Sequence, residues 1–341
     1  MIFKSKPIEN KLIQDAYDEG IETFSDFFNV KPVGFKPDVF ILDNRADIDI
    51  VKGKKTENWV VGWTTGQSLF VLDYDKFDTE SKHNKSESAY QNLIKHELCH
   101  IFTRTSSRNA ILPMWLNEGI SIYLSGQLGM NKKPDKFSGF IESTLNNHKA
   151  AYVEGGYVVE LLLNLFGREK FIDLLRGYSE EKFKDIYGFD LTYENINSLY
   201  QSQEISSNEA VEKFKEIIDK PFKIQVKHNG NIELKFPEYL LSVERSWDVW
   251  DTNKDYHSQD FVSLKDEETI ESFVGKTSLS GVDITRNSIF SFFFENGKEI
   301  DVTGYSPDSG FYFKLFSFKP KESTLALTST FKYILLSDNL K

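Results

Sequence analysis

The sequence predicts an α+β protein of two domains, and three observations favour this fold class. The chain has 341 residues, which suffices for two domains of ordinary size. Helical patterns dominate residues 1–218 after an early region of strands, whereas residues 219–341 hold short aromatic and β-branched runs separated by turn residues. We therefore expect a first domain over 1–218, with a small N-terminal sheet and a mostly helical second part. An antiparallel β-rich domain over 219–341 should follow it.

The first domain is expected to begin with one helix and three strands. Apolar residues recur at three- and four-residue spacing over 8–29, which predicts an amphipathic helix. Apolar runs bounded by proline, glycine and aspartate predict strands at 39–42, 58–61 and 68–72. These strands would form the small N-terminal sheet.

Two helices joined by a turn are predicted next. The first covers 88–104, where Ser88 and Gln91 resemble a capping box. Pro113 suits the first turn of the second helix, and Gly126 suits its end. Their proximity in the chain allows the two helices to pack together.

The helical part should end with three more helices. A strongly apolar helix is predicted over 151–166 and is stopped by Gly167. Another helix should run to about residue 178, and a last one is expected over 209–219.

Turn signals organise the β-rich domain. Asn229-Gly230 and Asn296-Gly297 each lie between short apolar runs, which is typical of β-hairpins. Runs at 311–318 and 325–336 predict further strands.

Composition argues against several classes of partner. The 41 Lys and Arg residues against 52 Asp and Glu give a net charge of −11, so we expect neither nucleic acid nor an anionic membrane as the main partner. The single cysteine, Cys99, excludes a disulfide framework within the chain and an all-cysteine zinc site. No signal peptide or run of 18 uncharged apolar residues is apparent, so we expect a cytoplasmic protein.

A His-Glu-x-x-His sequence, formed by His96-Glu97-Leu98-Cys99-His100, lies within the predicted helix 88–104. Histidines four residues apart project from one face of a helix, so both imidazoles can reach one metal ion. Glu97 is offset by about 100° and would lie beside that ion, where it can take a proton from water. This pattern predicts a zinc site with Glu97 as the general base. The alternative is a pair of hydrogen-bonded core histidines.

Glu118 is the candidate third ligand. It is the one carboxylate between residues 101 and 134, a stretch that contains no histidine or cysteine. A glutamate on the second of two packed helices can reach a metal held by the first. The alternative is a carboxylate in the first turn of a helix, favoured by the helix dipole. The metzincin arrangement is absent, because Thr103 and Ser106 stand where its glycine and third histidine would be.

Together with the downstream Trp115-Leu116-Asn117-Glu118-Gly119, the motif at 96–100 resembles the gluzincin metallopeptidases. The resemblance is to the branch that contains catalytic domains of the aminopeptidase N and leukotriene hydrolase type. In that family the glutamate of the Asn-Glu-Gly sequence is the third zinc ligand. The resemblance therefore implies a zincin-like metallopeptidase domain with one Zn²⁺ ion. Its ligands would be His96, His100 and Glu118, and Glu97 would be the general base.

A second segment extends the resemblance. Ala151-Tyr152-Val153-Glu154-Gly155 is similar to the family's Tyr-x-Lys-Gly segment, whose tyrosine donates a hydrogen bond to the oxyanion of the tetrahedral intermediate. The resemblance implies this catalytic role for Tyr152, and a neutral phenol is chemically suited to it. The alternatives are an interfacial aromatic residue at this position, or His148, one turn earlier, in the catalytic role.

Three departures from the family pattern bear on specificity. Seventeen residues separate His100 from Glu118, one fewer than is usual in that branch. Ile122 stands where thermolysin-like enzymes have an aspartate that orients a zinc-bound histidine. No counterpart of the Gly-x-Met-Glu-Asn segment, which binds a substrate amine in the aminopeptidases, lies upstream of His96. Endopeptidase action is therefore favoured over aminopeptidase action.

The family also places an edge strand along the cleft, just before the His-Glu-x-x-His helix. This implies that residues 66–73 form an edge to which a peptide adds by main-chain hydrogen bonds. A plain buried strand is the alternative.

We thus expect a zinc-dependent peptidase acting on peptide or protein substrates. Two other functions stay open. One is a catalytically vestigial zincin-fold protein that binds a partner through its β-rich domain. The other is zinc-dependent hydrolysis of a non-peptide substrate. The sequence predicts no oligomeric state.

Overall fold

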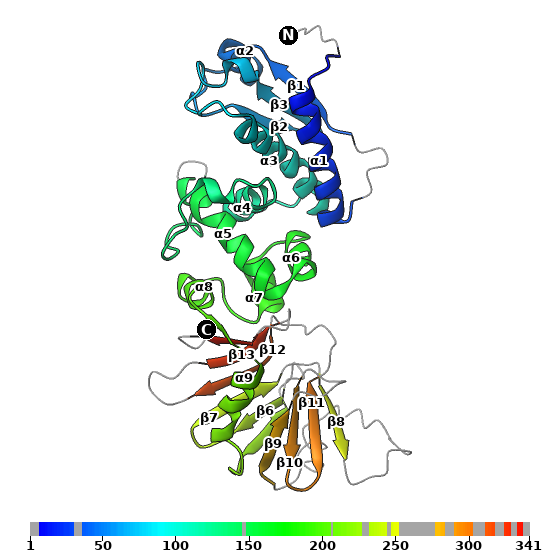
Figure 1. Ribbon diagram of the computed structural model, residues 1–341, viewed down its shortest axis with the longest axis vertical. Coiled ribbons are helices and arrows are strands. Elements are labelled where there is room, and N and C mark those ends of the chain that lie inside the picture. Colours follow the sequence, from blue (N-terminus) through cyan, green and yellow to red (C-terminus); the bar gives the residue numbers. More distant parts are fainter. Residues whose placement is uncertain are drawn as a thin grey trace. The chain divides into compact units, whose positions relative to one another are not determined.

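The chain forms two compact units of helices and sheets, which confirms the mixed α+β class. The first unit is Met1–Glu160 with Leu175–Tyr178, and the second is Leu161–Leu174 with Ser179–Lys341. The predicted division at residue 218 rests on sequence character and stays a prediction. The computed structural model (Figure 1) describes residues 7–30, 36–144, 148–205, 207–226, 232–243, 247–251, 277–283, 290–302, 311–317, 324–328 and 333–336.

The first unit begins with a three-stranded sheet and its helices. The elements are α1 (Lys11–Phe28), β1 (Asp38–Leu42), α2 (Arg45–Lys52), β2 (Gly62–Thr65), β3 (Ser68–Leu72) and the 3-10 helix η1 (Tyr74–Lys76). The strand order is β1-β3-β2, with β3 parallel to β1 and antiparallel to β2. The expectation that residues 66–73 form the edge next to the cleft is therefore wrong. In this sheet β3 is central, and β2 is an edge strand.

The strand predicted at 58–61 is also wrong. These residues form a turn and irregular chain, and the strand begins at Gly62. The guanidinium of Arg45 explains the difference, because it donates hydrogen bonds to the carbonyl oxygens of Glu57, Asn58 and Val60. A side chain thus satisfies carbonyl groups that would otherwise be free to pair with a strand, although the apolar run looks like a strand.

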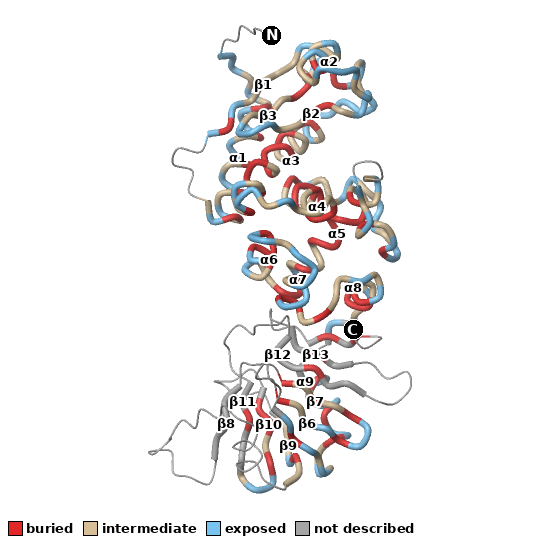
Figure 2. Tube along the Cα trace, turned by 180° about the vertical axis from the view of Figure 1, so that it is seen from behind, coloured by how far each residue is buried: buried red, intermediate tan, exposed pale blue. Residues whose placement is uncertain are grey.

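Two packed helices follow the sheet, as predicted. Helix α3 (Glu87–Ser106) contacts α1, α4, β2 and β3, and α4 (Met114–Leu124) begins directly after Pro113. The predicted capping box at Ser88 is wrong, since the N-cap of α3 is Ser86, whose hydroxyl accepts the backbone N–H of Ala89 at 3.1 Å. Buried residues are concentrated along α3, α4 and α5 (Lys149–Phe166) (Figure 2).

Shorter helices follow, starting with the 3-10 helix η2 (Leu128–Met130) after α4. Helix α5 ends before Gly167, whose φ of +84° is a conformation that favours glycine. The helix predicted to reach residue 178 is shorter, since α6 (Arg168–Leu175) ends earlier. Helices α2, α7 (Glu180–Tyr187) and α8 (Tyr193–Tyr200) were not predicted, because eight residues are too few for a clear periodic pattern.

The second unit contains two sheets. After β4 (Gln203–Ile205), α9 (Ser207–Lys213) and the 3-10 helix η3 (Phe214–Glu216), every element in the described part of the chain is a strand. The strands are β5 (Lys223–Val226), β6 (Ile232–Lys235), β7 (Tyr239–Val243), β8 (Trp247–Asp251), β9 (Leu279–Asp283), β10 (Phe290–Phe294), β11 (Lys298–Val302), β12 (Phe311–Ser317), β13 (Thr324–Thr328) and β14 (Tyr333–Leu336).

All strand pairs in these two sheets are antiparallel, as expected. One sheet has the order β4-β14-β13-β12-β7-β6-β5 and the other has β8-β11-β10-β9. The predicted hairpins are confirmed by the pairing of β5 with β6 and of β10 with β11, although Asn229-Gly230 lies outside the described residues. Strand β4 joins the larger sheet from before residue 218.

None of the helices in the described residues combines the length and the apolar character that a membrane crossing requires.

Candidate metal centre

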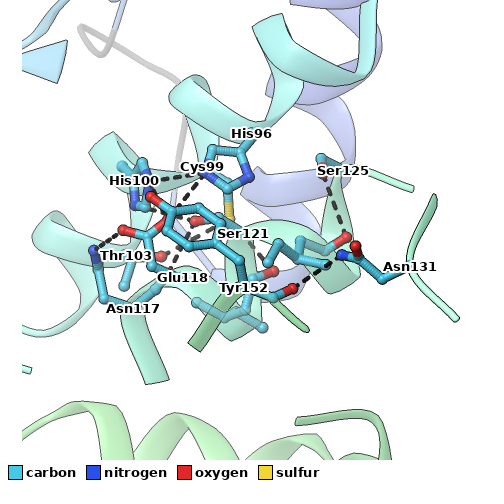
Figure 3. Close-up of polar contacts among 12 residues, drawn as sticks. His96, Cys99, His100, Thr103, Asn117, Glu118, Ser121, Ser125, Asn131 and Tyr152 are labelled. Carbon is cyan, nitrogen blue, oxygen red and sulfur yellow. Dashed lines mark hydrogen bonds and ion pairs between the residues drawn. The ribbon is translucent and has the colours of Figure 1, made fainter. Parts of the chain in front are cut away.

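The three predicted ligands converge on one point (Figure 3). His96 and His100 lie one turn apart on α3, and their Nε2 atoms are 3.1 Å from each other. The Oε2 atom of Glu118, on α4, is 3.3 Å from Nε2 of His96 and 3.6 Å from Nε2 of His100. The packing of α4 on α3 therefore brings a carboxylate to the pair of imidazoles, as the sequence analysis expected.

Two polar atoms of this cluster have no hydrogen-bond partner within the described residues. They are Oε2 of Glu118 and Nδ1 of His96, and both are buried. A buried acceptor without a donor is costly, and a cation bound between the imidazoles and the carboxylate would satisfy Glu118. Two imidazole nitrogens and one carboxylate oxygen are a donor set that suits a divalent transition-metal ion. The cluster therefore fits a metal ion.

Ser121 orients one of the two imidazoles. Its Oγ lies 3.1 Å from Nδ1 of His100 and donates its own proton to the carbonyl oxygen of Asn117, also at 3.1 Å. Because the hydroxyl has one proton, we assign the proton between Ser121 and His100 to Nδ1. In neutral His100, the form that binds a metal ion, this tautomer leaves the lone pair of Nε2 directed at the centre. The sequence analysis missed Ser121, whose signal is its place one turn after Glu118.

Opposite charges stabilise the ligand cluster. Burial, the largest single effect, raises the pKa of Glu118, but His100 and His96 outweigh it and hold this pKa well below its ordinary value. Burial alone would lower the pKa of His100, yet the Glu118 carboxylate raises it to about 9. Glu118 is therefore ionised and able to act as a ligand.

Glu97 lies beside the ligands in a tight space. Its side chain is buried, and burial raises the pKa of its carboxyl group despite the nearby His100 and His96. Gly62 of β2 passes so close that a Cβ atom there would lie 3.1 Å from Cγ of Glu97. A glycine at this position of the edge strand therefore leaves room for the candidate base.

Tyr152 reaches the same place from α5. Its ring lies 6.5 Å from the ring of His96, centroid to centroid, and is stacked on it. Burial and the nearby Glu118 carboxylate raise the pKa of its phenol, so the hydroxyl keeps its proton. His148, the alternative candidate, contacts the rings of Tyr152 and Trp59 and is not among the residues that line the cavity at the centre.

Glu154 stands where the Tyr-x-Lys-Gly segment of the gluzincins has a lysine, and its carboxylate contacts backbone N–H groups. Its Oε2 accepts the backbone N–H groups of Ser138, Gly139 and Phe140 at 3.0–3.1 Å. Three such donors stabilise a buried carboxylate. Glu154 thereby fixes the loop before α5 to the helix that carries Tyr152.

Cys99 lies inside the motif but takes no part in the cluster of donor atoms. Its thiol is buried, 3.8 Å from Oγ1 of Thr103 and 3.9 Å from the carbonyl oxygen of Ile120. Burial raises its pKa to about 12, so the thiol is neutral and serves packing.

Helices α4 and α5 approach each other through glycines. A Cβ atom on Gly119 would lie 2.5 Å from the carbonyl oxygen of Gly155, and one on Gly155 would lie 2.7 Å from that of Trp115. Gly119 follows Glu118 directly, and Gly155 lies one turn after Tyr152. The contact between these glycines therefore sets the separation between a candidate ligand and the candidate oxyanion donor.

A cavity of about 430 Å³ opens at the centre. The edge strand, α3, the α3–α4 connection, α4 and α5 all contribute to its wall, so it lies within the first unit. Its lining residues are Gly62, Trp63, Thr64, His96, Glu97, His100, Thr103, Arg104, Ser107, Ala110, Leu112, Asn117, Glu118 and Tyr152.

Comparison of the chain with protein-family models, with curated proteins and with solved structures gives no match. Membership of the gluzincins, implied by the sequence motifs, is therefore a proposal.

Replacing Ser121 by alanine should weaken metal binding. The variant removes the acceptor that fixes the His100 tautomer, and we expect the affinity for Zn²⁺ to fall by about 10- to 100-fold in competition with a chelator. Ser125→Ala is the matched control, because this buried hydroxyl at the C-cap of the same helix donates to the carbonyl oxygen of Ile122 instead. Equal affinities in the two variants would contradict the assignment.

A methyl group on Gly119 should disturb both stability and metal binding. Gly119→Ala forces α4 away from α5, and overpacking of this kind costs about 1–3 kcal/mol of unfolding free energy. Thermal unfolding and zinc titration would measure the two effects. In Gly129→Ala the new Cβ meets nothing within 4 Å, so this control should behave as wild type. An unaltered zinc affinity in Gly119→Ala would show that the contact does not position Glu118.

Proposed function

We propose that the protein is a zinc-dependent peptidase of the gluzincin type, with a zincin-like catalytic domain that includes α3, α4 and α5. The observation that carries this proposal is the convergence of His96, His100 and Glu118, with a buried carboxylate oxygen that has no donor within the described residues. The buried Glu97 beside this cluster supplies a base, and the cavity supplies space for a substrate. A pair of hydrogen-bonded core histidines would need neither a buried base beside it nor a cavity.

In this proposal His96, His100 and Glu118 hold the zinc ion. When bound, zinc supplies a Lewis acid that polarises a carbonyl group and makes water more acidic. Glu97 accepts a proton from the attacking water on its carboxylate and later delivers that proton to the leaving nitrogen. Burial, which raises the pKa of Glu97, makes its carboxylate a stronger base for the first transfer.

Tyr152 acts on the oxygen of the former carbonyl group. Its phenol donates a hydrogen bond to the negative charge that develops there, and the donor is most effective in a site that excludes water. The burial that keeps the phenol protonated also lowers the local dielectric constant.

The edge strand β2 suggests how a peptide would bind. Gly62, Trp63 and Thr64 line the cavity, and β2 has a strand partner on one side only in the three-stranded sheet. An extended peptide that adds to the open side gains main-chain hydrogen bonds along the cavity. Such binding does not require a free amino terminus, which agrees with the absence of the family's amine-binding segment and with endopeptidase action.

The decisive experiment separates metal binding from turnover. Glu97→Gln should keep one zinc ion per chain and lose at least about 100-fold in the rate of peptide hydrolysis, because the base is removed and the ligands stay. Zinc is measured by elemental analysis, and products from an unfolded protein substrate by mass spectrometry. Glu87→Gln, at an exposed position in the first turn of α3, is the matched control and should keep both properties.

Glu118→Ala completes the test. It should lose most of the bound zinc, because two imidazoles alone bind the ion less tightly. Little zinc in both the wild type and Glu118→Ala would refute the metal site. Full zinc content with undiminished hydrolysis in Glu97→Gln would refute the mechanism.

A further inference from the structure

Arg104 lies on the same face of α3 as the two histidines, one turn beyond His100. It lines the same cavity. Its Nη1 donates to the carbonyl oxygen of Gly66 at 2.8 Å and its Nη2 to Oγ1 of Thr64 at 3.1 Å. The guanidinium is thus held against the end of the edge strand, at one side of the cavity.

The positive charge of Arg104 has no acidic partner among the described residues. Within that part of the chain no ion pair of 4 Å or less involves it, and its two side-chain hydrogen bonds go to neutral oxygens. A guanidinium has five N–H donors, and three of those of Arg104 have no acceptor among the described residues. The helix dipole also favours a cation in the last turn of α3, but that interaction does not require the side chain to lie in the cavity beside β2.

The path of strand β2 shows how far Arg104 lies from the candidate metal centre, counted in residues along the strand. Gly62 lies against Glu97, and Thr64, two residues later in β2, contacts Arg104. A peptide paired with β2 would follow the same path, with alternate side chains on the same face. The substrate residue near Arg104 would therefore be about two positions from the residue at the centre.

We propose that Arg104 is a specificity residue that binds a carboxylate of the substrate, about two residues from the scissile bond. The inference rests on the proposed peptidase function and names its substrate class, which is peptides with an acidic group at that distance. The carboxylate belongs either to an aspartate or glutamate side chain or to a free C-terminus. A planar guanidinium suits a carboxylate from either source, because it can donate two parallel hydrogen bonds.

The test uses the zinc-loaded full chain and peptides that differ in one group. One set places glutamate or glutamine at each of three positions on either side of the bond, and a second set ends in a free or an amidated C-terminus. At one position the acidic member of a pair should have a higher kcat/KM, on the order of 10- to 100-fold. The set in which this preference occurs identifies the source of the carboxylate.

Substitutions of Arg104 test whether this residue causes the preference for the acidic peptide. Arg104→Gln should reduce the preference to about one, and Arg104→Glu should favour lysine at that position. Arg108→Gln is the control, because Arg108 is exposed, is four residues further on and does not line the cavity. A merely structural Arg104 would lower turnover equally for both members of a pair. An unchanged ratio in Arg104→Gln would therefore overturn the inference, as would the absence of any preference in the wild type.

A binding measurement separates this inference from the proposed function. Zinc-loaded Glu97→Gln is titrated with the same labelled peptides, and fluorescence anisotropy gives their affinities. Glu97→Gln should bind the acidic peptide more tightly than its neutral partner, and the double variant Glu97→Gln/Arg104→Gln should bind both equally. This result supports the role of Arg104 even where the wild type hydrolyses nothing. Hydrolysis without any such discrimination supports the peptidase and overturns the role of Arg104.

Discussion

The packing of α4 against α3 is the interaction on which the candidate site depends. It brings the Glu118 carboxylate to 3.3 Å from an imidazole nitrogen of His96, and it brings Ser121 to the far side of the His100 ring. One helix therefore supplies both a ligand and the group that orients another ligand. The buried carboxylate of Glu118 needs a compensating positive charge, which a protonated imidazole or a bound cation supplies.

Glycines, which have no side chain, allow other elements to approach this pair of helices. Gly119 and Gly155 let α5 touch α4, which brings Tyr152 to the centre, and Gly62 lets the edge strand pass Glu97. The wall of the cavity is consequently made from backbone as well as side chains. Because close-packed elements transmit small shifts, the distances at the centre depend on contacts that take no part in the chemistry.

Features that local geometry decides were predictable from the sequence. Histidines four residues apart must share a face once a helix forms, so the pairing of His96 with His100 was predictable. The long helices were predictable for the same reason, since each has enough turns to show its apolar face. The strand expected at 58–61 failed because the guanidinium of Arg45, at the start of α2, satisfies the carbonyl groups of Asn58 and Val60.

The sequence by itself determined the α+β class, the long helices, the hairpins and the candidate ligand residues, because periodicity and turn chemistry are local properties. Only the tertiary structure decided that β2 is the edge strand at the cavity, that Ser121 orients His100 and that Arg104 faces the same space. These relations join residues from different elements. Their distances depend on how sheet and helices pack, which no local pattern in the chain records.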